Sequence, residues 1–237
     1  MFHSIDFNIM LIIVSKDIGR EALKHLENYG KVVLFETQGI TYSAIENHPD
    51  IYFCPYNKQI IAAPNTPSQI IAALNTFNVE VISGKKHIGK VYPQTAYYNA
   101  VISNQYLIHH LSFTDTVIKN STQHLSHIHI NQGYTRCNLL ALPNNSFITS
   151  DKGIAKTLRE NDIDTLYVNP ESIYLRSFAH GFFGGCCGIA VPYFFINGSL
   201  KYFSEKDSIE CYIDNAGLKL VELSRGRPED IGSLFFV

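Results

Sequence analysis

The sequence lacks any surplus of positive charge. Its 237 residues include 19 Lys and Arg against 21 Asp and Glu, which gives a formal net charge of −2 at neutral pH. Nucleic-acid binding depends on clustered cations that neutralise phosphates, so this balance argues against RNA or DNA as a partner. The longest basic patch, from Gly84 to Lys90, is interpreted as a solvated loop rather than an anion site.

The chain also lacks a disulfide framework. Its cysteines are odd in number and irregularly spaced: Cys54, Cys137, Cys186, Cys187 and Cys211. This usage favours a reducing compartment. Residues 1–17 contain no basic segment typical of a signal peptide, and their apolar run is too short to cross a bilayer. We therefore expect a soluble, cytoplasmic protein that does not insert into membranes.

No spacing of cysteine or histidine predicts a metal centre. Cys186 and Cys187 have no second pair at the separation typical of a structural zinc site. His124, His127 and His129 are interpreted as a solvated or packed strand face rather than as ligands. No cofactor is expected.

What the sequence does contain is an internal repeat. Residues 11–35 and 146–168 each give a β-rich run, a Ser/Asp/Lys group, a helical pattern and a second β-rich run. In each copy an aspartate, Asp17 or Asp151, is placed to cap the start of the helix. Hydrophobic residues make up 46% of the chain, an ordinary globular balance that can build a shared core.

Three further copies, in residues 60–83, 106–130 and 199–223, bring the number of strand–helix–strand units to about five. Four helices follow a two-strand hairpin. The expected hairpin turns are Asn57-Lys58, Asn104-Gln105, Asn144-Asn145 and Asn197-Gly198, and residues 187–196 are expected to form a single leading strand.

The first unit has no leading strand, whereas the chain ends in a strand, DIGSLFFV, that has no partner after it. We expect Leu234–Val237 to pair beside Leu11–Val14, which completes the fifth unit and removes exposed sheet edges. The predicted fold is therefore an α/β protein, a five-fold pseudosymmetric β/α propeller of ββαβ units. It is expected to form a single domain over residues 1–237.

A closed set of five ββαβ units resembles the pentein fold, the β/α propeller of the guanidino-group-modifying enzymes. The phrases HPDIYF, YPQTAYYNAV, NQGYTRCNLLAL, FITSDKGIAKTL, HGFFGGCCG and DIGSLFF also resemble an uncharacterised bacterial family assigned to that fold. The similarity extends from about Met10 to Val237. Because one fold supports many functions, it implies the architecture more strongly than the chemistry.

The enzymes that this chain resembles are hydrolases and transferases that act on arginine-like substrates. A cysteine attacks the guanidinium carbon, a histidine moves protons, and carboxylates hold the cationic nitrogens. In those enzymes the cysteine follows a glycine pair near the C-terminus, usually directly after a histidine. Gly184-Gly185-Cys186-Cys187 occupies the comparable place, so the resemblance makes Cys187 the first candidate nucleophile. The five units of such a ring surround a central pore. Successive strand residues point to opposite faces, so Cys186 and Cys187 are not expected to face this pore together.

This sequence departs from the pattern of those enzymes. Cys186 stands where the histidine would precede the nucleophile, and residues 133–138 contain neither the histidine nor the acid expected at that strand start. A proton mover would have to be His180 or His48. Cys137 is the second candidate nucleophile, because alternation with Thr135 could turn it toward the pore. The alternative is a small buried side chain.

Two acids are candidates to hold a cationic ligand. Asp50 follows Pro49 at the expected start of a leading strand, where the resemblance implies a substrate-binding acid; the alternative is a turn residue. Asp230 is expected to begin the closing strand and to reach the ring axis. Further candidates around this opening are Asn99, Arg136 and the glycines Gly184 and Gly185, which permit close approach of the backbone.

Two functions are therefore open. The first is an enzyme, or a degenerate relative of one, that binds or hydrolyses a small guanidino or amidine cation with a central cysteine. The second is a non-catalytic binding protein on the same fold, with a protein or small-molecule partner at the pore mouth. The missing histidine counts against catalysis.

Overall fold

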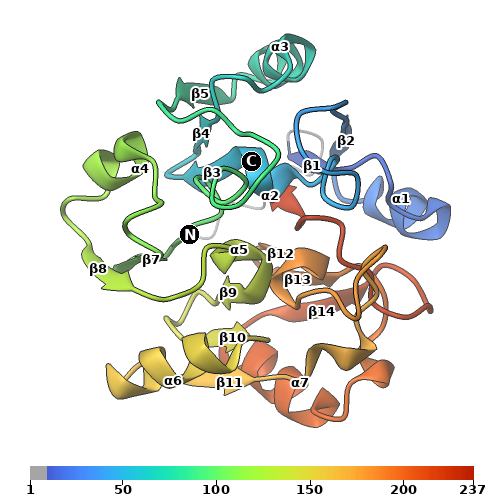
Figure 1. Cartoon of the computed structure of the whole chain (residues 1–237). Coiled ribbons are helices and arrows are strands. Elements are labelled where there is room, and N and C mark those ends of the chain that lie inside the picture. The colour runs from blue at the N-terminus through green and yellow to red at the C-terminus, as the bar shows by residue number, and fades with distance from the viewer. Residues whose placement is uncertain (1–9) are drawn as a thin grey trace, which may run out of the picture.

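The computed structural model describes residues 10–237 as a mixed α/β fold with five small three-stranded sheets (Figure 1). In each sheet the middle strand pairs antiparallel with a leading strand and parallel with a third strand. A parallel pair needs a crossover connection, and a helix supplies it in each unit. The repeat read from the sequence is therefore a structural repeat.

The first sheet contains β15 (Phe235–Phe236), β1 (Leu11–Ser15) and β2 (Lys31–Phe35), with α1 (Arg20–Leu26) as its crossover. The second unit comprises α2 (Pro49–Tyr52), β3 (Phe53–Tyr56), β4 (Gln59–Ala62), α3 (Ser68–Thr76) and β5 (Glu80–Ser83). The third comprises β6 (Val101–Ile102), β7 (Tyr106–His109), α4 (Thr116–Ser121) and β8 (Ser126–His129).

The fourth unit comprises α5 (Thr135–Asn138), β9 (Leu139–Ala141), β10 (Phe147–Thr149), α6 (Lys152–Glu160) and β11 (Thr165–Tyr167). The fifth comprises the 3₁₀ turn η2 (Gly184–Cys186), β12 (Cys187–Ala190), β13 (Tyr193–Ile196), the 3₁₀ turn η3 (Leu200–Tyr202), α7 (Lys206–Asn215) and β14 (Lys219–Glu222). A further 3₁₀ turn, η1 (Pro170–Ser172), lies in the connection between them.

The two ends of the described chain share one sheet. Ile12 lies opposite Phe236 and Ile13 opposite Phe235, in antiparallel register. The amides of Leu11 and Val237 each donate to the carbonyl of the other, at 2.9 Å in both directions. The predicted pairing of the last strand with the first is confirmed, and β15 takes the place of the leading strand that the first unit lacks.

Most of the expected hairpin turns are confirmed, but the one in the fifth unit is wrong. Tyr56 pairs with Gln59 around Asn57-Lys58, as expected. In the fifth unit, however, Ala190 pairs with Tyr193, so the turn is Val191-Pro192 and residues 187–196 form two strands. Proline has no amide hydrogen and a fixed φ, which exclude it from the interior of a continuous paired strand. That rule, applied to Pro192, would have placed the turn correctly.

Of the two predicted helix caps, the one at Asp151 is confirmed and the one at Asp17 is wrong. The carboxylate of Asp151 accepts a hydrogen bond from the amide of Ile154 at 2.9 Å, as a cap does. Asp17 is not a cap: α1 begins after Gly19, and the Asp17 carboxylate accepts instead from the Asn47 side chain at 2.8 Å. The equivalence of the two aspartates in sequence does not extend to their contacts.

Buried apolar side chains fill the space between each sheet and its helix. Every residue of β1 is buried, and Ala22 and Leu26 of α1 and Ile154 and Leu158 of α6 turn inward. In each helix the two buried positions are four residues apart, the spacing of one face of an amphipathic helix. Within residues 10–237, no helix has the length and apolar character needed to cross a membrane.

Candidate functional site

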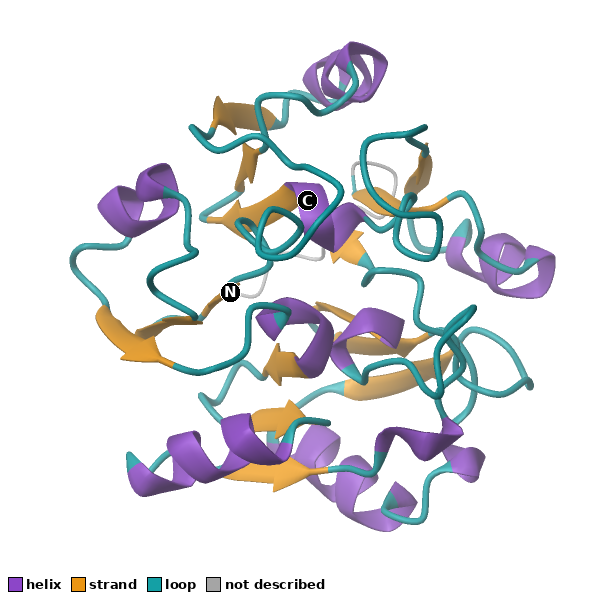
Figure 2. Cartoon of the chain, in the orientation of Figure 1, coloured by secondary structure: helices purple, strands orange, loops and turns teal. Residues whose placement is uncertain are grey.

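A helical turn precedes three of the leading strands, α2 before β3, α5 before β9 and η2 before β12, and these turns lie in the middle of the molecule (Figure 2). Figure 2 shows the short helices α2 and α5 at the centre, with the longer crossover helices outside. The α5 helix also contacts η2, and the Asp50 amide donates to the carbonyl of Gly232, just before β15, at 3.2 Å. Asp50 and Cys137 therefore lie on helical turns, and the expectation that they belong to strands is wrong.

The side chain of Asp50 lies at the centre of the junction where these turns meet. It is fully buried, and its Oδ2 atom accepts hydrogen bonds from the Cys137 thiol at 3.2 Å and from the Ser233 hydroxyl at 2.8 Å. The other oxygen, Oδ1, has no hydrogen-bond partner in the described part of the chain. A buried carboxylate oxygen without a partner is costly to the folded state.

Asn99 fixes the positions of Asp50 and Cys137. Its Nδ2 atom donates to the Asp50 carbonyl at 2.9 Å and lies 3.1 Å from the Cys137 sulfur. Its Oδ1 atom accepts from the Cys137 amide at 3.1 Å. Asn99 thus connects α2 to α5, and the structure brings together three of the residues singled out in the sequence.

Ser233 completes the junction and was missed by sequence reasoning. Its hydroxyl lies within hydrogen-bonding distance of the Asp50 carboxylate and, at 3.0 Å, of the Gly184 carbonyl. Its position in the repeat is a signal that points to it. The residue two places before the first residue of a leading strand is Asn99, Cys137, Gly185 or Ser233 in four of the units. Aligning the units on their leading strands would have found it.

Gly184 and Gly185 allow η2 to approach this junction. A Cβ atom at Gly184 would lie 2.2 Å from the Arg136 carbonyl oxygen, and one at Gly185 would lie 2.1 Å from the Asp230 carboxylate. Any larger side chain would push η2 away from α5 or from Asp230. The close approach expected of this glycine pair is present.

A cavity of about 90 Å³ lies at one end of the junction. Its wall is mostly apolar and aromatic, with one thiol, one carboxylate and one imidazole among the lining residues: Tyr42, Ile45, His48, Ile51, Tyr134, Cys137, Leu175, Phe178, Phe182 and Asp230. A water molecule occupies about 30 Å³ of liquid. This cavity, here called the Cys137 cavity, therefore has room for a small planar group.

Asp230 supplies the carboxylate of the Cys137 cavity. Its oxygens accept from the amides of Phe182 and Gly232, both at 3.0 Å. The residue lies in the loop before β15 and does not begin that strand, so its expected secondary structure is wrong. The Nδ1 atom of His48 lies 3.8 Å from Asp230 Oδ1, on the same cavity wall.

Burial controls the protonation of this group of residues. It raises the pKa of Asp230 to about 6, an effect that neighbouring His48 offsets in part and Asp50 reinforces. Burial, together with the charge of Asp50, also raises the pKa of the Cys137 thiol well above its usual value. The resting sulfur is therefore a neutral thiol that donates to Asp50.

Cys186 and Cys187 lie in different surroundings. Both are fully buried in a hydrophobic cluster that includes Phe183 and Phe194. Their sulfur atoms are 3.9 Å apart, because Cys186 belongs to the turn η2 and only Cys187 to the strand. The expectation that the two thiols separate to opposite faces of a strand is wrong, and neither lines the Cys137 cavity.

Two other candidate residues lie outside the Cys137 cavity. His180 is partly exposed, and its Nδ1 atom is 2.9 Å from the Gly181 carbonyl. Arg136 is the neighbour of Cys137 on α5 but lines a second cavity, which the strand residues Leu140, Ile189 and Phe236 also line. Consecutive residues of a helical turn point in different directions, so Arg136 does not share the opening of Cys137.

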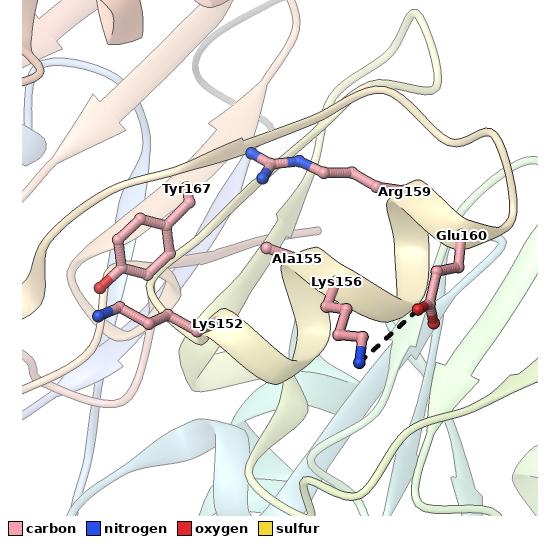
Figure 3. Close-up of a pocket in the computed structure, with 6 residues that line it drawn as sticks. All are labelled: Lys152, Ala155, Lys156, Arg159, Glu160 and Tyr167. Atoms are coloured by element: carbon pink, nitrogen blue, oxygen red, sulfur yellow. Dashed lines mark ion pairs between the residues drawn. The ribbon is translucent and has the colours of Figure 1, made fainter.

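Residues 10–237 contain no cluster of three His, Cys, Asp or Glu side chains that could hold a metal ion. A separate groove of about 520 Å³ lies over α6 and β11 (Figure 3). Its charged groups are engaged locally: Lys156 pairs with Glu160 at 3.8 Å, and Arg159 donates to the Thr165 carbonyl. None of the candidate site residues lines it.

Comparisons with known proteins agree with this architecture. The family model "Family of unknown function (DUF6873)" matches residues 13–235, and no curated protein matches the sequence. The solved structure of agmatine deiminase from C. jejuni has a TM-score of 0.52 at 9% identity, covering 94% of this chain and 93% of that one.

A dimethylarginine dimethylaminohydrolase adduct with 4-chloro-2-hydroxymethylpyridine has a TM-score of 0.50 at 11% identity, covering 91% of this chain and 92% of that one. DDAH from Pseudomonas aeruginosa, complexed with citrulline, has a TM-score of 0.49 at 11% identity, with 91% of each chain covered. At such low identity the similarities to agmatine deiminase and to the dimethylarginine dimethylaminohydrolase adduct establish the fold alone. The resemblance to the pentein fold is confirmed.

Proposed function

This chain belongs to the family of unknown function DUF6873, and we propose that it binds a small guanidino or amidine cation in the Cys137 cavity. The observation that carries the proposal is the enclosure of a buried carboxylate and a thiol by aromatic walls. A planar cation would donate to Asp230 and lie against the rings of Tyr42, Tyr134 and Phe178.

The residues that line the cavity also restrict the charge of the ligand that fits. His48 is the one residue of the lining that can carry positive charge, and it already faces Asp230. A ligand carboxylate would therefore have no cation of its own to pair with inside this small cavity. The proposed ligand is a compact alkyl-guanidine or alkyl-amidine without a carboxylate, rather than a whole amino acid.

We propose Cys137, rather than Cys187, as the nucleophile of a hydrolytic reaction. The Cys137 sulfur forms a bond to the central carbon of the ligand while its proton passes to Asp50, 3.2 Å away. One carbon–nitrogen bond then breaks, and the departing amine takes a proton from His48. Water then adds its hydroxyl to the central carbon and gives a proton back to His48. The carbon–sulfur bond breaks, the sulfur regains its proton from Asp50, and the urea or amide product leaves after losing its extra proton to solvent. A bound cation next to the sulfur lowers the cost of its ionisation.

The second candidate function is binding of the same cation without reaction. The observation that favours it is the neutral Cys137 thiol, which donates to Asp50 and whose pKa is raised. In that case Cys137 and Asp50 hold the junction together, and Asp230 alone recognises the ligand.

We further propose that the five sheets form a closed five-fold ring and that residues 1–237 form one domain. The pairing of β1 with β15 supports both proposals. The five free thiols support a cytoplasmic location.

A cationic alkylating reagent tests the proposed function. We expect chloroacetamidine to modify Cys137 at least about tenfold faster than the neutral reagent chloroacetamide, because only the amidine is attracted by Asp230. Mass spectrometry of the intact chain and its peptides gives the rate for each cysteine. Cys211, which is exposed, is the internal control and should show no such preference.

The variant Asp230→Asn should remove the preference for the amidine, and methylguanidine should protect Cys137. Binding of methylguanidine in a calorimetric titration, without any labelling of Cys137, would favour binding without reaction. Equal rates with both reagents at Cys137, together with no detectable binding of methylguanidine, would exclude both functions.

A further inference from the structure

A second cavity, of about 180 Å³, lies among the leading strands and is here called the Arg136 cavity. All five leading strands contribute to its lining, through Pro55, Ile102, Leu140, Ile189 and Phe236 among others. Leading strands have turns at one end, where the Cys137 cavity lies, so the Arg136 cavity is formed farther along the strands. Cys137 lines the first cavity and Arg136 the second.

Arg136 is the one charged residue that lines this cavity. One terminal nitrogen donates to the Gly184 carbonyl at 2.9 Å and the other to the Cys187 carbonyl at 3.3 Å. The guanidinium also lies 5.4 Å from the centre of the Phe235 ring. Within the described residues no carboxylate forms an ion pair with it.

The guanidinium of Arg136 therefore has binding capacity left. It carries five N–H donors, and two are given to the backbone carbonyls of Gly184 and Cys187. Burial lowers its pKa, whereas the charge of nearby Asp50 raises it. A partly buried cation of this kind is stabilised by an anion that reaches it from the cavity.

The walls determine what kind of anion fits. Apart from Arg136, the lining side chains are hydrocarbon or aromatic, including Val101, Leu234 and Phe235. A larger groove of about 810 Å³ continues from the cavity and shares Pro55, Ile102, Ile189 and Phe236 with it; farther from the cavity its lining is more polar and includes Lys58. A hydrated inorganic anion gains nothing from the apolar side chains of the cavity, whereas a planar carboxylate with a hydrocarbon tail can contact both Arg136 and those side chains.

We propose that the Arg136 cavity is a binding site for a short-chain aliphatic carboxylate. The carboxylate accepts from the free N–H groups of Arg136, and the tail lies along Ile102, Ile189 and Phe236 toward the adjoining groove. This site is independent of the cation proposed for the Cys137 cavity, because the two ligands have opposite charge and different lining residues.

Titration of the full chain with hexanoate, followed by calorimetry and ligand-detected NMR, tests the site. We expect saturable binding of hexanoate, with affinity rising about fourfold for each CH₂ group from acetate to hexanoate. Hexan-1-ol and inorganic phosphate should bind at least about tenfold more weakly. Equal binding of hexan-1-ol or phosphate, or no saturable hexanoate binding up to about 10 mM, would overturn the proposal.

Variants locate the site. Arg136→Gln should weaken hexanoate binding at least about tenfold, and Arg136→Lys should lose part of the affinity because the planar fork is lost. Since Arg136 also supports Gly184 and Cys187, the variant Ala141→Phe provides a second test: it fills the cavity without altering the cation. Ala72→Phe, on the exposed face of α3, is the matched control and should bind normally.

Unchanged hexanoate binding in both Arg136→Gln and Ala141→Phe would place the ligand elsewhere and refute the site. Chloroacetamidine labelling of Cys137 in the same variants reports separately on the Cys137 cavity. Failure of one site is therefore distinguishable from failure of the other.

Discussion

Binding of methylguanidine weakens about tenfold when the pH is lowered from 7.5 to 5, because Asp230 loses its charge. Burial raises the pKa of this carboxyl to about 6, so about nine tenths of it is protonated at pH 5. Methylguanidinium itself stays cationic over this range. Calorimetric titration at a series of pH values measures the effect.

The variant Asp230→Asn should bind methylguanidine weakly and without this slope. Cys137→Ser should keep the slope, because the thiol is neutral throughout. A wild-type profile that is flat between pH 5 and 7.5, with binding retained, would show that Asp230 does not hold the cation.

The free energy of unfolding should fall as the pH rises, whereas the binding of methylguanidine strengthens. The pKa of Asp230 is higher in the folded chain, about 6, than its ordinary value of 3.8. The proton therefore stabilises the folded state: this contribution is complete below about pH 4 and is lost as the pH rises through about 6. It amounts to about 3 kcal/mol. Comparison of urea unfolding of the wild type and Asp230→Asn at several pH values isolates it.

Substitution Gly184→Ala lowers the free energy of unfolding by about 2 to 3 kcal/mol. The added Cβ would lie 2.2 Å from the Arg136 carbonyl oxygen and 2.8 Å from that of Cys137. Both are backbone atoms that cannot rotate away, so η2 and α5 must separate. That movement also breaks the contact of Ser233 with Gly184 and displaces Cys137.

Gly19→Ala is the matched control for Gly184→Ala. Gly19 has a negative φ of −60° and no atom near its added Cβ. The same chemical change there should alter stability by no more than about 1 kcal/mol in either direction. Urea midpoints measured for both variants give the comparison. Equal midpoints would mean that the turn around Gly184 adapts and that the close packing of η2 against α5 contributes little.

The architecture could be predicted from the sequence to a large extent. The repeat depends on local signals, the alternation of strand and helix patterns, and these recur whatever the surroundings. The pairing of Ile12 with Phe236 could also be anticipated, because an incomplete first unit and an unpaired last strand complement each other. The turn at Val191-Pro192 was misplaced because the Asn-Gly signal was given more weight than the constraint on Pro192.

The candidate site was predicted only in part. Asp50, Asn99 and Cys137 do come together, and Asp230 and His48 share a cavity with Cys137. The direction of each side chain could not be foreseen, because a single helical turn before β3, β9 and β12 replaces the alternation assumed for a strand. That turn directs Arg136 and Cys137 into different cavities and places Cys186 beside Cys187 in the core.

The sequence by itself determined the five units, their order and the elements that form them, because hydrophobic periodicity and turn chemistry act over a few residues. Only the tertiary structure decided which cysteine meets a carboxylate. Asp50, Cys137 and Ser233 are distant in the chain, and their contacts depend on how closely the turns pack. Glycines at 184 and 185 permit that packing, but no local pattern specifies the partners that it brings together.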